Sequence, residues 1–207
     1  MVKQVITYKI NDSLYINVTN RCSNSCVFCI RQTEEGVGYN LWLKKEPDIE
    51  DIIKEIPNPK DFKEIVFCGY GEPLIRAKLV LEVSSILKQK GAHSIRINTN
   101  GHANMIHNQN IIPEMKDIID IVSISLNAEN VPKYVKLCRP VFGEKAYPAL
   151  LEFARLSSKT VNKVILTAVD WPGIDLKACK QIADNIGVEF RSRNFTGTIK
   201  SNHKKII

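Results

Sequence analysis

The chain has 207 residues, of which 44% are hydrophobic and 25% are charged, and its formal net charge is +7. This length fits one domain or a tight pair, and the composition is that of a globular protein, which excludes disordered, collagen-like and fibrous chains. No apolar run approaches the ~18 residues that span a membrane, and the N-terminus lacks the pattern of a signal peptide. We therefore expect a single domain over residues 1–207 and a cytoplasmic location.

The hydrophobic pattern predicts strands and helices in alternation. Two short strands flank residues 11–13, where Asn, Asp and Ser favour a tight turn. Helices are indicated by apolar residues at i, i+3, i+4 and i+7, and the last helix has Asp175 and Gly187 at its ends. Strands are expected at residues 5–10, 14–18, 64–68, 94–98, 119–126, 163–169 and 188–191, and helices at residues 48–56, 77–90, 111–118, 131–137, 145–157 and 176–186.

The order of these elements indicates an α/β fold. From the second strand onward, strands alternate with helices, which implies βαβ crossovers and a parallel sheet. A complete eight-unit barrel takes about 250 residues, so this chain has room for about six units. The spacing fits a partial barrel of six units, and it fits a doubly wound sheet of six strands equally well.

Three of the six cysteines lie in one loop after the second strand, where Cys22, Cys26 and Cys29 form a C-x3-C-x2-C pattern. This grouping indicates a metal site, because disulfide frameworks typify short secreted chains. Thiolates suit iron–sulfur clusters, zinc or copper(I), but structural zinc wants four ligands and the loop offers three. Three thiolates on a four-iron cluster would leave one iron open to a substrate or cofactor. A chance or zinc-binding group of cysteines is the competing interpretation.

Two further motifs follow strands. The segment CGYGEP at residues 68–73 combines glycines, which let a ligand approach the backbone closely, with Glu72 as an acceptor. The segment INTNG at residues 97–101 offers Asn98 and Asn100, which could bind ribose hydroxyls or a carboxylate. Each segment taken alone also fits an ordinary turn.

Together the three motifs resemble those of the radical S-adenosylmethionine (radical SAM) enzymes. The cysteine loop carries the family's aromatic residue as Phe28, YGEP resembles the glycine–glutamate motif with Tyr70 in place of its usual first glycine, and NTNG resembles the ribose motif. The resemblance extends over residues 14–188. It implies a partial (βα)6 TIM-like barrel with a short N-terminal β-strand hairpin, a 4Fe–4S cluster and bound SAM.

The resemblance also implies a reaction and a set of site residues. Cys22, Cys26 and Cys29 would bind three irons, and SAM would bind the fourth. One electron would then cleave SAM to methionine and a 5′-deoxyadenosyl radical, which abstracts hydrogen from an unidentified substrate. The electron would come from a donor such as flavodoxin or ferredoxin. The residues expected to contact SAM are Phe28, Gly71, Glu72, Asn98, Asn100, Ser125 and Asp170.

Several residues outside the motifs are further candidates for the site, each with an ordinary structural alternative. Alternation places Ser123, Ser125 and Asn127 on one face of the fourth strand of the series, either toward the ligands or as ordinary inward residues. Arg191 and Arg193 could meet an anionic substrate or be solvated. Cys138 and Cys179 are expected in the core, whereas Cys68 is either a site residue or a core residue. Tyr39 and Trp42 are expected either to form a lid or to pack on the barrel wall.

A narrower resemblance concerns the segments LYINVTNRCSNSCVFCIR, VFCGYGEPLIR and LCRP. They are similar to the small radical SAM proteins associated with TatD-family hydrolases, which implies a functional link to such a hydrolase. The basic charge leaves an RNA-modifying enzyme open, with a macromolecular or otherwise anionic substrate. An activase of a glycyl-radical partner and a non-enzymatic iron–sulfur or zinc scaffold are the remaining alternatives. A short basic tail holds Lys200, His203, Lys204 and Lys205.

Overall fold

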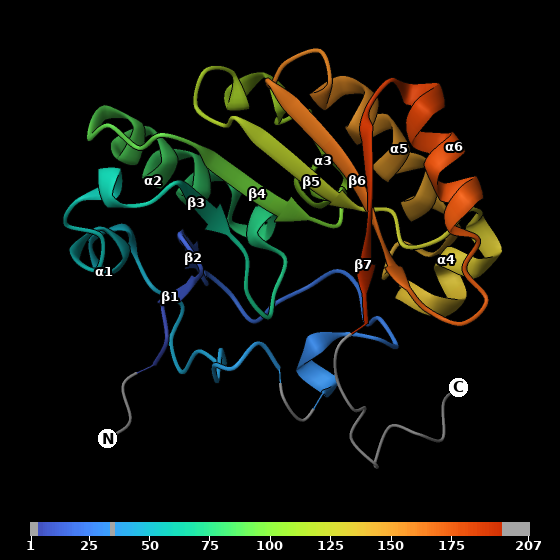
Figure 1. Ribbon diagram of the computed structural model, residues 1–207, viewed down its shortest axis with the longest axis horizontal. Coiled ribbons are helices and arrows are strands. Elements are labelled where there is room, and N and C mark those ends of the chain that lie inside the picture. Colours follow the sequence, from blue (N-terminus) through green and yellow to red (C-terminus); the bar gives the residue numbers. More distant parts are fainter. Residues whose placement is uncertain (1–3, 34–35, 196–207) are drawn as a thin grey trace.

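The computed structural model describes residues 4–33 and 36–195, which leaves the basic tail outside the described part. Its centre is a curved sheet in which each strand neighbours the next along the chain (Figure 1). Only the first pair, β1 and β2, is antiparallel, and all later pairs are parallel. The strands are β1 (Thr7–Ile10), β2 (Ser13–Ile16), β3 (Glu64–Phe67), β4 (Ile95–Thr99), β5 (Ile121–Ser125), β6 (Lys163–Asp170) and β7 (Glu189–Asn194).

The strand order decides between the two folds that the sequence allowed. A doubly wound sheet reverses its order at a switch point, whereas this sheet runs β1-β2-β3-β4-β5-β6-β7 without reversal. The parallel strands β2 to β7 therefore confirm the partial barrel, preceded by the expected hairpin. Within the described residues β1 and β7 are not paired with each other, so the barrel is open.

The helices connect the parallel strands, and Figure 1 shows α2, α5 and α6 along the outer side of the curved sheet. None of the described helices has the length and apolarity to cross a membrane. The helices are α1 (Ile49–Lys54), α2 (Ala77–Gln89), α3 (Ala103–His107), α4 (Val131–Cys138), α5 (Ala146–Ser157) and α6 (Leu176–Ile186).

Local chemistry explains why several elements begin and end where they do. Asn11 takes the left-handed conformation (φ 51°) that a two-residue hairpin turn between β1 and β2 requires. The Asp175 side chain accepts hydrogen bonds from the backbone of Lys177 and Ala178 and so caps α6. Gly187 ends the same helix at φ 80°. These ends confirm the sequence predictions.

One predicted element is wrong. The helix expected at residues 111–118 is only a 3-10 turn, Ile112–Met115. Pro113 and the left-handed Asp117 (φ 61°) interrupt any longer helix there. The helix of this connection lies earlier, as α3, and ends at the left-handed Asn108.

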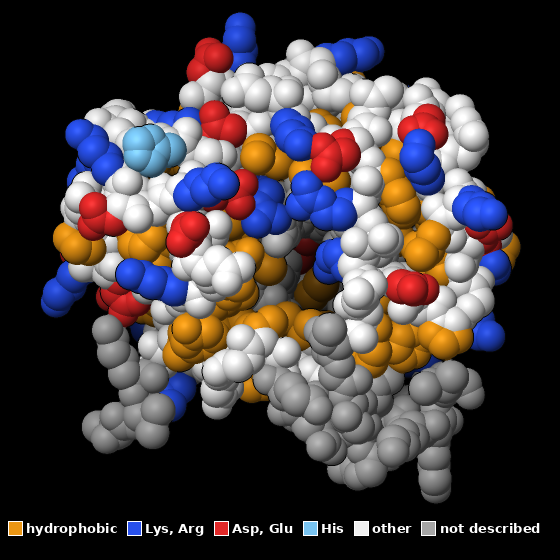
Figure 2. All heavy atoms as spheres, viewed as in Figure 1, with side chains coloured by type: hydrophobic (Ala, Val, Ile, Leu, Met, Phe, Trp, Pro, Cys, Tyr) orange, Lys and Arg blue, Asp and Glu red, His pale blue; other side chains and the backbone are white. Residues whose placement is uncertain are grey.

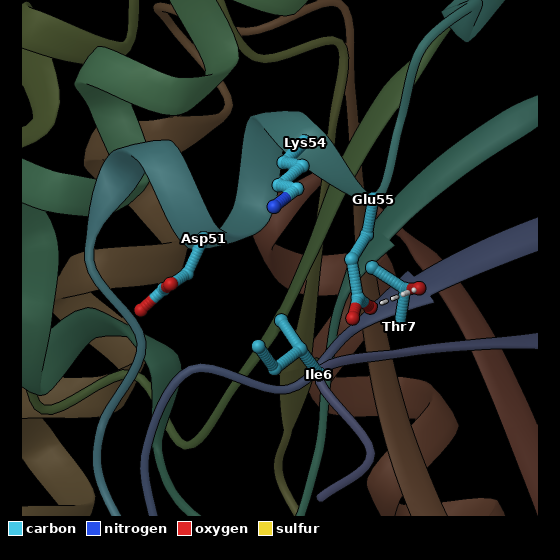
Figure 3. A pocket seen from close by; sticks show the side chains of 5 residues that line it. All are labelled: Ile6, Thr7, Asp51, Lys54 and Glu55. Carbon is cyan, nitrogen blue, oxygen red and sulfur yellow. Dashed lines mark hydrogen bonds between the residues drawn. The ribbon is translucent and has the colours of Figure 1, made fainter. Parts of the chain in front are cut away.

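The two faces of the sheet differ in chemistry because side chains alternate along each strand. On β4, Ile95 and Ile97 are fully buried in the core, while Arg96 and Asn98 line a cavity on the opposite face. The inner face of the open barrel is therefore polar. A separate hollow of about 500 Å³ lies between β1 and α1 (Figure 3), where Thr7 Oγ1 donates to Glu55 Oε2 at 2.9 Å. This second hollow is lined by none of the predicted site residues.

Candidate functional site

A cavity of about 370 Å³ opens at the carboxyl ends of the parallel strands, where barrel folds build their sites. Figure 2 shows this face hollowed near its centre, with Lys and Arg side chains around the hollow. The cavity brings together residues that lie far apart in the chain. Among the predicted site residues, it is lined by Cys22, Cys26, Cys29, Phe28, Gly71, Glu72, Asn98, Asn100 and Ser125.

Asp170 is the one predicted site residue that the structure does not bring to the cavity. It is exposed at the end of β6, whereas Thr167 and Val169 of the same strand line the cavity. Since side chains alternate along a strand, Asp170 points away from the face on which Val169 lies. The same alternation confirms that Ser123, Ser125 and Asn127 share the cavity face.

The cysteine loop is held by the chain segment that ends α4. Ser25 N donates to Cys138 O at 3.0 Å, and Val27 N donates to Leu137 O at 2.9 Å. The left-handed backbone of Arg139 (φ 46°) ends the helix and turns the chain along the loop. The segment LCRP thus supplies main-chain acceptors for the loop, a role that its sequence did not reveal.

Hydrogen-bond donors surround the loop sulfurs. Cys22 Sγ accepts from Asn24 N at 3.4 Å and from Asn100 Nδ2 at 3.8 Å, and Cys29 Sγ accepts from Arg31 Nε at 3.4 Å. Such donors tune the potential of an iron–sulfur cluster. Burial raises the pKa of the Cys22 thiol to about 12, although a coordinating thiol is deprotonated by the metal.

The arrangement of the three thiols fits a polynuclear cluster. All three are free of disulfides and line one cavity. Asn24 lines the same cavity, and its Oδ1 is buried without a hydrogen-bond partner among the described residues. The residues present therefore fit a four-iron cluster with a ligand beside it.

The glycine motif packs directly against the cysteine loop. A Cβ on Gly71 would lie 2.3 Å from Thr19 O and 2.5 Å from Arg21 O. Both contacts are with backbone, so neither can be relieved by a side-chain rotation. Glu72 N also donates to Arg21 O at 2.8 Å. Glycine is therefore required here so that the two loops can meet.

The Glu72 carboxylate joins the loops that follow β3 and β4. Oε1 accepts from Thr99 Oγ1 at 2.7 Å and from Leu74 N at 3.0 Å, and Oε2 accepts from Asn100 N at 2.7 Å. The side chain is 3% exposed, and burial raises its pKa to about 7. Glu72 thus fixes the backbone at Asn100, whose amide lies against Cys22.

A buried polar network behind the cysteine loop was missed by the sequence analysis. Asn100 Nδ2 donates to Ser23 Oγ at 2.8 Å, and Ser23 Oγ lies 3.2 Å from His102 Nδ1. His102 Nε2 lies 3.0 Å from the Tyr134 hydroxyl, which also accepts from Asn24 Nδ2 at 3.2 Å. Burial lowers the pKa of His102 to about 4, so the ring is neutral and bonds through one N–H and one lone pair. Ser23 lies inside the cysteine motif and His102 directly follows the third motif, so their position was a signal in the sequence, whereas Tyr134 on α4 had none.

The remaining cavity lining is polar on one side and aromatic on the other. Arg96 Nη2 pairs with Glu64 at 2.8 Å and its Nη1 donates to Asn98 Oδ1 at 3.0 Å. Phe28 and Phe195 line the cavity. The buried Trp171 packs between them, with ring centroids 5.5 Å and 4.9 Å away.

The structure also places the three cysteines outside the loop and the aromatic residues Tyr39 and Trp42. Cys68 lines the cavity, while Cys138 and Cys179 are buried in the core as expected. The Cys138 thiol hydrogen-bonds to Cys26, which together with burial raises the pKa of Cys26 well above its ordinary value. Tyr39 packs on Tyr8 and Trp42 on Tyr70, and neither lines the cavity. Tyr39 and Trp42 thus pack on neighbouring rings while remaining partly exposed.

Sequence comparisons relate the chain to proteins of known family. The family model of the radical SAM superfamily matches residues 16–186. The probable GTP 3′,8-cyclase of Methanocaldococcus jannaschii is 32% identical over 133 residues, which are 64% of this chain and 41% of that protein. The 7-carboxy-7-deazaguanine synthase of the same organism is 32% identical over 128 residues, 56% of this chain and 47% of that protein. The chain thus spans less than half the length of these two relatives.

Solved structures share the fold. Methylornithine synthase superposes with a TM-score of 0.65 at 14% identity, covering 89% of this chain and 53% of that one. A radical SAM methyltransferase from Sphaerobacter thermophilus gives 0.59 at 16% identity, covering 91% and 68%. At these identities the likeness shows the fold alone.

Proposed function

Because the chain belongs to the radical SAM superfamily, whose cofactors are a 4Fe–4S cluster and SAM, we propose that it uses both to remove a hydrogen atom from a substrate. The observation that carries this proposal is the convergence of Cys22, Cys26 and Cys29 with Glu72 and Asn100 on one cavity. Cluster and SAM, when bound together and reduced, supply methionine and a 5′-deoxyadenosyl radical. The protein supplies position and seclusion.

Each motif residue has a role in this proposal. The three thiolates hold the cluster, and the N–H groups of Asn24, Asn100 and Arg31 orient the sulfurs. A carboxylate has about four lone-pair sites, of which Glu72 uses three, so one acceptor position remains for the amino group of SAM.

The other lining residues receive the rest of SAM. The rings of Phe28 and Phe195, both on the cavity wall, suit a flat adenine, because aromatic faces stack on aromatic rings. Asn98 and Ser125 lie on neighbouring strands of the polar side and suit the ribose hydroxyls. The proposal assigns no contact to Asp170, which lies outside the cavity.

The test is anaerobic reconstitution with iron and sulfide, followed by dithionite reduction and chromatography for 5′-deoxyadenosine after SAM is added. We expect about four irons per chain for the wild type and product formation. Cys22→Ala, Cys26→Ala and Cys29→Ala should lose both. Cys179→Ala, a buried cysteine of α6 outside the cavity, is the matched control and should keep both. A wild-type protein that binds zinc in place of iron would contradict the proposal and favour the scaffold alternative.

The chemical class of the substrate distinguishes an enzyme that acts on a small molecule from an RNA-modifying enzyme and from a glycyl-radical activase. The relatives named above are a probable GTP 3′,8-cyclase and a 7-carboxy-7-deazaguanine synthase, and these names favour a small molecule over a protein partner. An RNA-modifying enzyme would instead retain RNA in a salt-dependent manner. A glycyl-radical activase would leave a radical signal on a co-purified partner. Deuterium transfer from a labelled substrate into 5′-deoxyadenosine identifies the substrate directly.

Partners and location remain predictions. Reduction requires an electron donor, for which we propose flavodoxin or ferredoxin. The link to a TatD-family hydrolase rests on the segments quoted above, and it can be tested by the solution mass of the reconstituted protein with and without that hydrolase. The six cysteines are free, which suits the cytoplasm because thiols persist in reducing compartments.

A further inference from the structure

The charge of the cavity points to a class of substrate. Three arginines line it, Arg96, Arg191 and Arg193, whereas Glu72 is the one carboxylate among the described lining residues. Glu72 is already occupied by three hydrogen bonds within the protein. Since a guanidinium remains charged at all physiological pH values, cationic side chains outnumber carboxylates among the described residues that line the cavity.

The three arginines differ in how far their charge is compensated. Arg96 is paired with Glu64 at 2.8 Å, and Arg191 with Glu189 at 3.0 Å. Arg193 forms no ion pair within residues 4–33 and 36–195. The one hydrogen bond of its guanidinium within those residues is long, 3.4 Å from Nη2 to the neutral Asn127 Oδ1. Arg193 is therefore a guanidinium that faces the cavity without an anionic partner in the described part of the chain.

Strand register places other donors beside this guanidinium. Arg191 and Arg193 are two residues apart on β7 and share one face of the strand. Arg191 is paired with Thr167 of β6, which is in turn paired with Ser125 of β5. Thr167 and Ser125 also line the cavity. Guanidinium and hydroxyl groups together form a donor set for the oxygens of a phosphate or carboxylate group.

We propose that Arg193, assisted by Arg191, binds an oxyanion of the substrate, so that the substrate is a small anionic molecule. This inference rests on the proposed function, because it assumes that SAM occupies the same cavity near the cysteine loop. The loop after β2 and the strand β7 come from the two ends of the parallel sheet, and both line the cavity. The substrate would thus be held by β7 and face the cysteine loop.

The experiment uses the full chain with an oxidised cluster and saturating SAM, titrated anaerobically by calorimetry at low salt. One arm uses pyrophosphate as the probe and the other uses citrate. We expect the wild type to bind at least one probe, and Arg193→Gln to bind it about 10-fold more weakly or worse. Binding of pyrophosphate alone assigns a phosphate group, and binding of citrate alone assigns a carboxylate. Arg155→Gln, on the exposed face of α5, is the matched control and should bind as the wild type does.

Three outcomes would overturn the inference. The first is equal probe affinity in the wild type and Arg193→Gln, or no binding of either probe. The second is loss of SAM affinity in Arg193→Gln with unchanged probe binding, which would assign the guanidinium to the SAM carboxylate. The third is binding of a single-stranded RNA that is weakened by Arg193→Gln more strongly than the binding of either probe is.

The same wild-type samples are assayed for iron and 5′-deoxyadenosine, so the two proposals can fail separately. Cleavage of SAM without oxyanion binding rejects only the substrate inference. Oxyanion binding without SAM cleavage rejects the proposed function, and it leaves an oxyanion site at β7 that is not a substrate site of that reaction.

Discussion

At the scale of single residues, Glu72 shows how one buried carboxylate can organise a site. Its two oxygens hold the backbones at Leu74 and Asn100 and the Thr99 hydroxyl. Asn100 in turn places its amide beside Cys22. The residue that the sequence marks as a ligand contact is therefore also a structural connector between two strand ends.

The raised pKa of Glu72 predicts a pH dependence of stability. The unfolded carboxyl has a pKa of about 4.3, and the folded one about 7, so the folded state binds the proton more tightly. The unfolding free energy of the cluster-free protein should therefore fall as pH rises from about 4 to about 7, by roughly 3 kcal/mol. Urea unfolding across this range checks it.

The control for this experiment is Glu72→Gln, which cannot titrate. His102 titrates in the opposite sense, since its lowered pKa of about 4 means that its contribution to stability is lost as pH falls below about 6.5. His102 is present in both proteins, so the difference between their pH profiles isolates Glu72. Parallel profiles would contradict the assignment.

Gly71 predicts a second residue-scale effect. Gly71→Ala places a Cβ 2.3 Å from Thr19 O, which should push the glycine motif away from the cysteine loop. We expect a loss of at least about 2 kcal/mol in unfolding free energy, as for overpacked sites, and reduced iron content after reconstitution. Gly173→Ala is the control, because its Cβ meets nothing within 4 Å although its φ is +86°. Iron content should stay normal in Gly173→Ala, and normal iron in Gly71→Ala would reject the argument.

At the scale of elements, α4 contributes more than packing. It carries Tyr134 in the network behind the loop and ends in the carbonyls of Leu137 and Cys138 that bind the loop backbone. A helix that the sequence marked only by its apolar face is thus the support of the cysteine loop.

Tyr134→Phe tests this support. Removing the hydroxyl leaves His102 and Asn24 without a shared partner, which should cost about 1–3 kcal/mol of unfolding free energy. We also expect a changed EPR spectrum of the reduced cluster, because Asn24 and Ser23 flank Cys22. The control is Tyr147→Phe on α5, which removes a hydroxyl that donates to Ala128 O at 3.0 Å. This variant should lose a similar amount of unfolding free energy and leave the EPR spectrum unchanged. Identical spectra in all three proteins would show that the network does not reach the cluster.

Helix bounds were predicted well where the end signals are local and poorly where they are not. The bounds of α6 were predicted residue for residue because both of its end signals, Asp175 and Gly187, are local. The helix expected at residues 111–118 failed because its apolar residues are buried by a 3-10 turn and irregular chain, with Ile112 and Met115 in the core. Burial alone does not distinguish a helix from a turn in so short a segment.

At the scale of the whole molecule, the open barrel depends on loops to complete its inner face. The cysteine loop contacts α4 and the loops after β3 and β4, so a bound cluster would tie together segments that are distant in the chain. Metal binding of this kind contributes to folding stability.

Removal of iron should therefore lower the melting temperature. We expect calorimetry under anaerobic conditions to show a Tm about 5 °C or more higher for the reconstituted protein than for protein treated with a chelator. Cys22→Ala should show no such difference, since it lacks one of the three cluster ligands. An equal Tm with and without iron in the wild type would mean that the cluster does not bridge these segments.

Residue type and local spacing were enough to establish the cysteine triad, the two motifs that follow β3 and β4, and the alternation of strands and helices. The spacing of the elements left two folds open, the resemblance to radical SAM enzymes implied the barrel, and the unreversed strand order confirmed it. Only the tertiary structure brought Ser23, His102 and Tyr134 into one network and placed Arg193 in the cavity while leaving Asp170 outside. These contacts join residues from different strand–helix units, and the curvature and register that bring them together arise from packing of the whole sheet rather than from any segment alone.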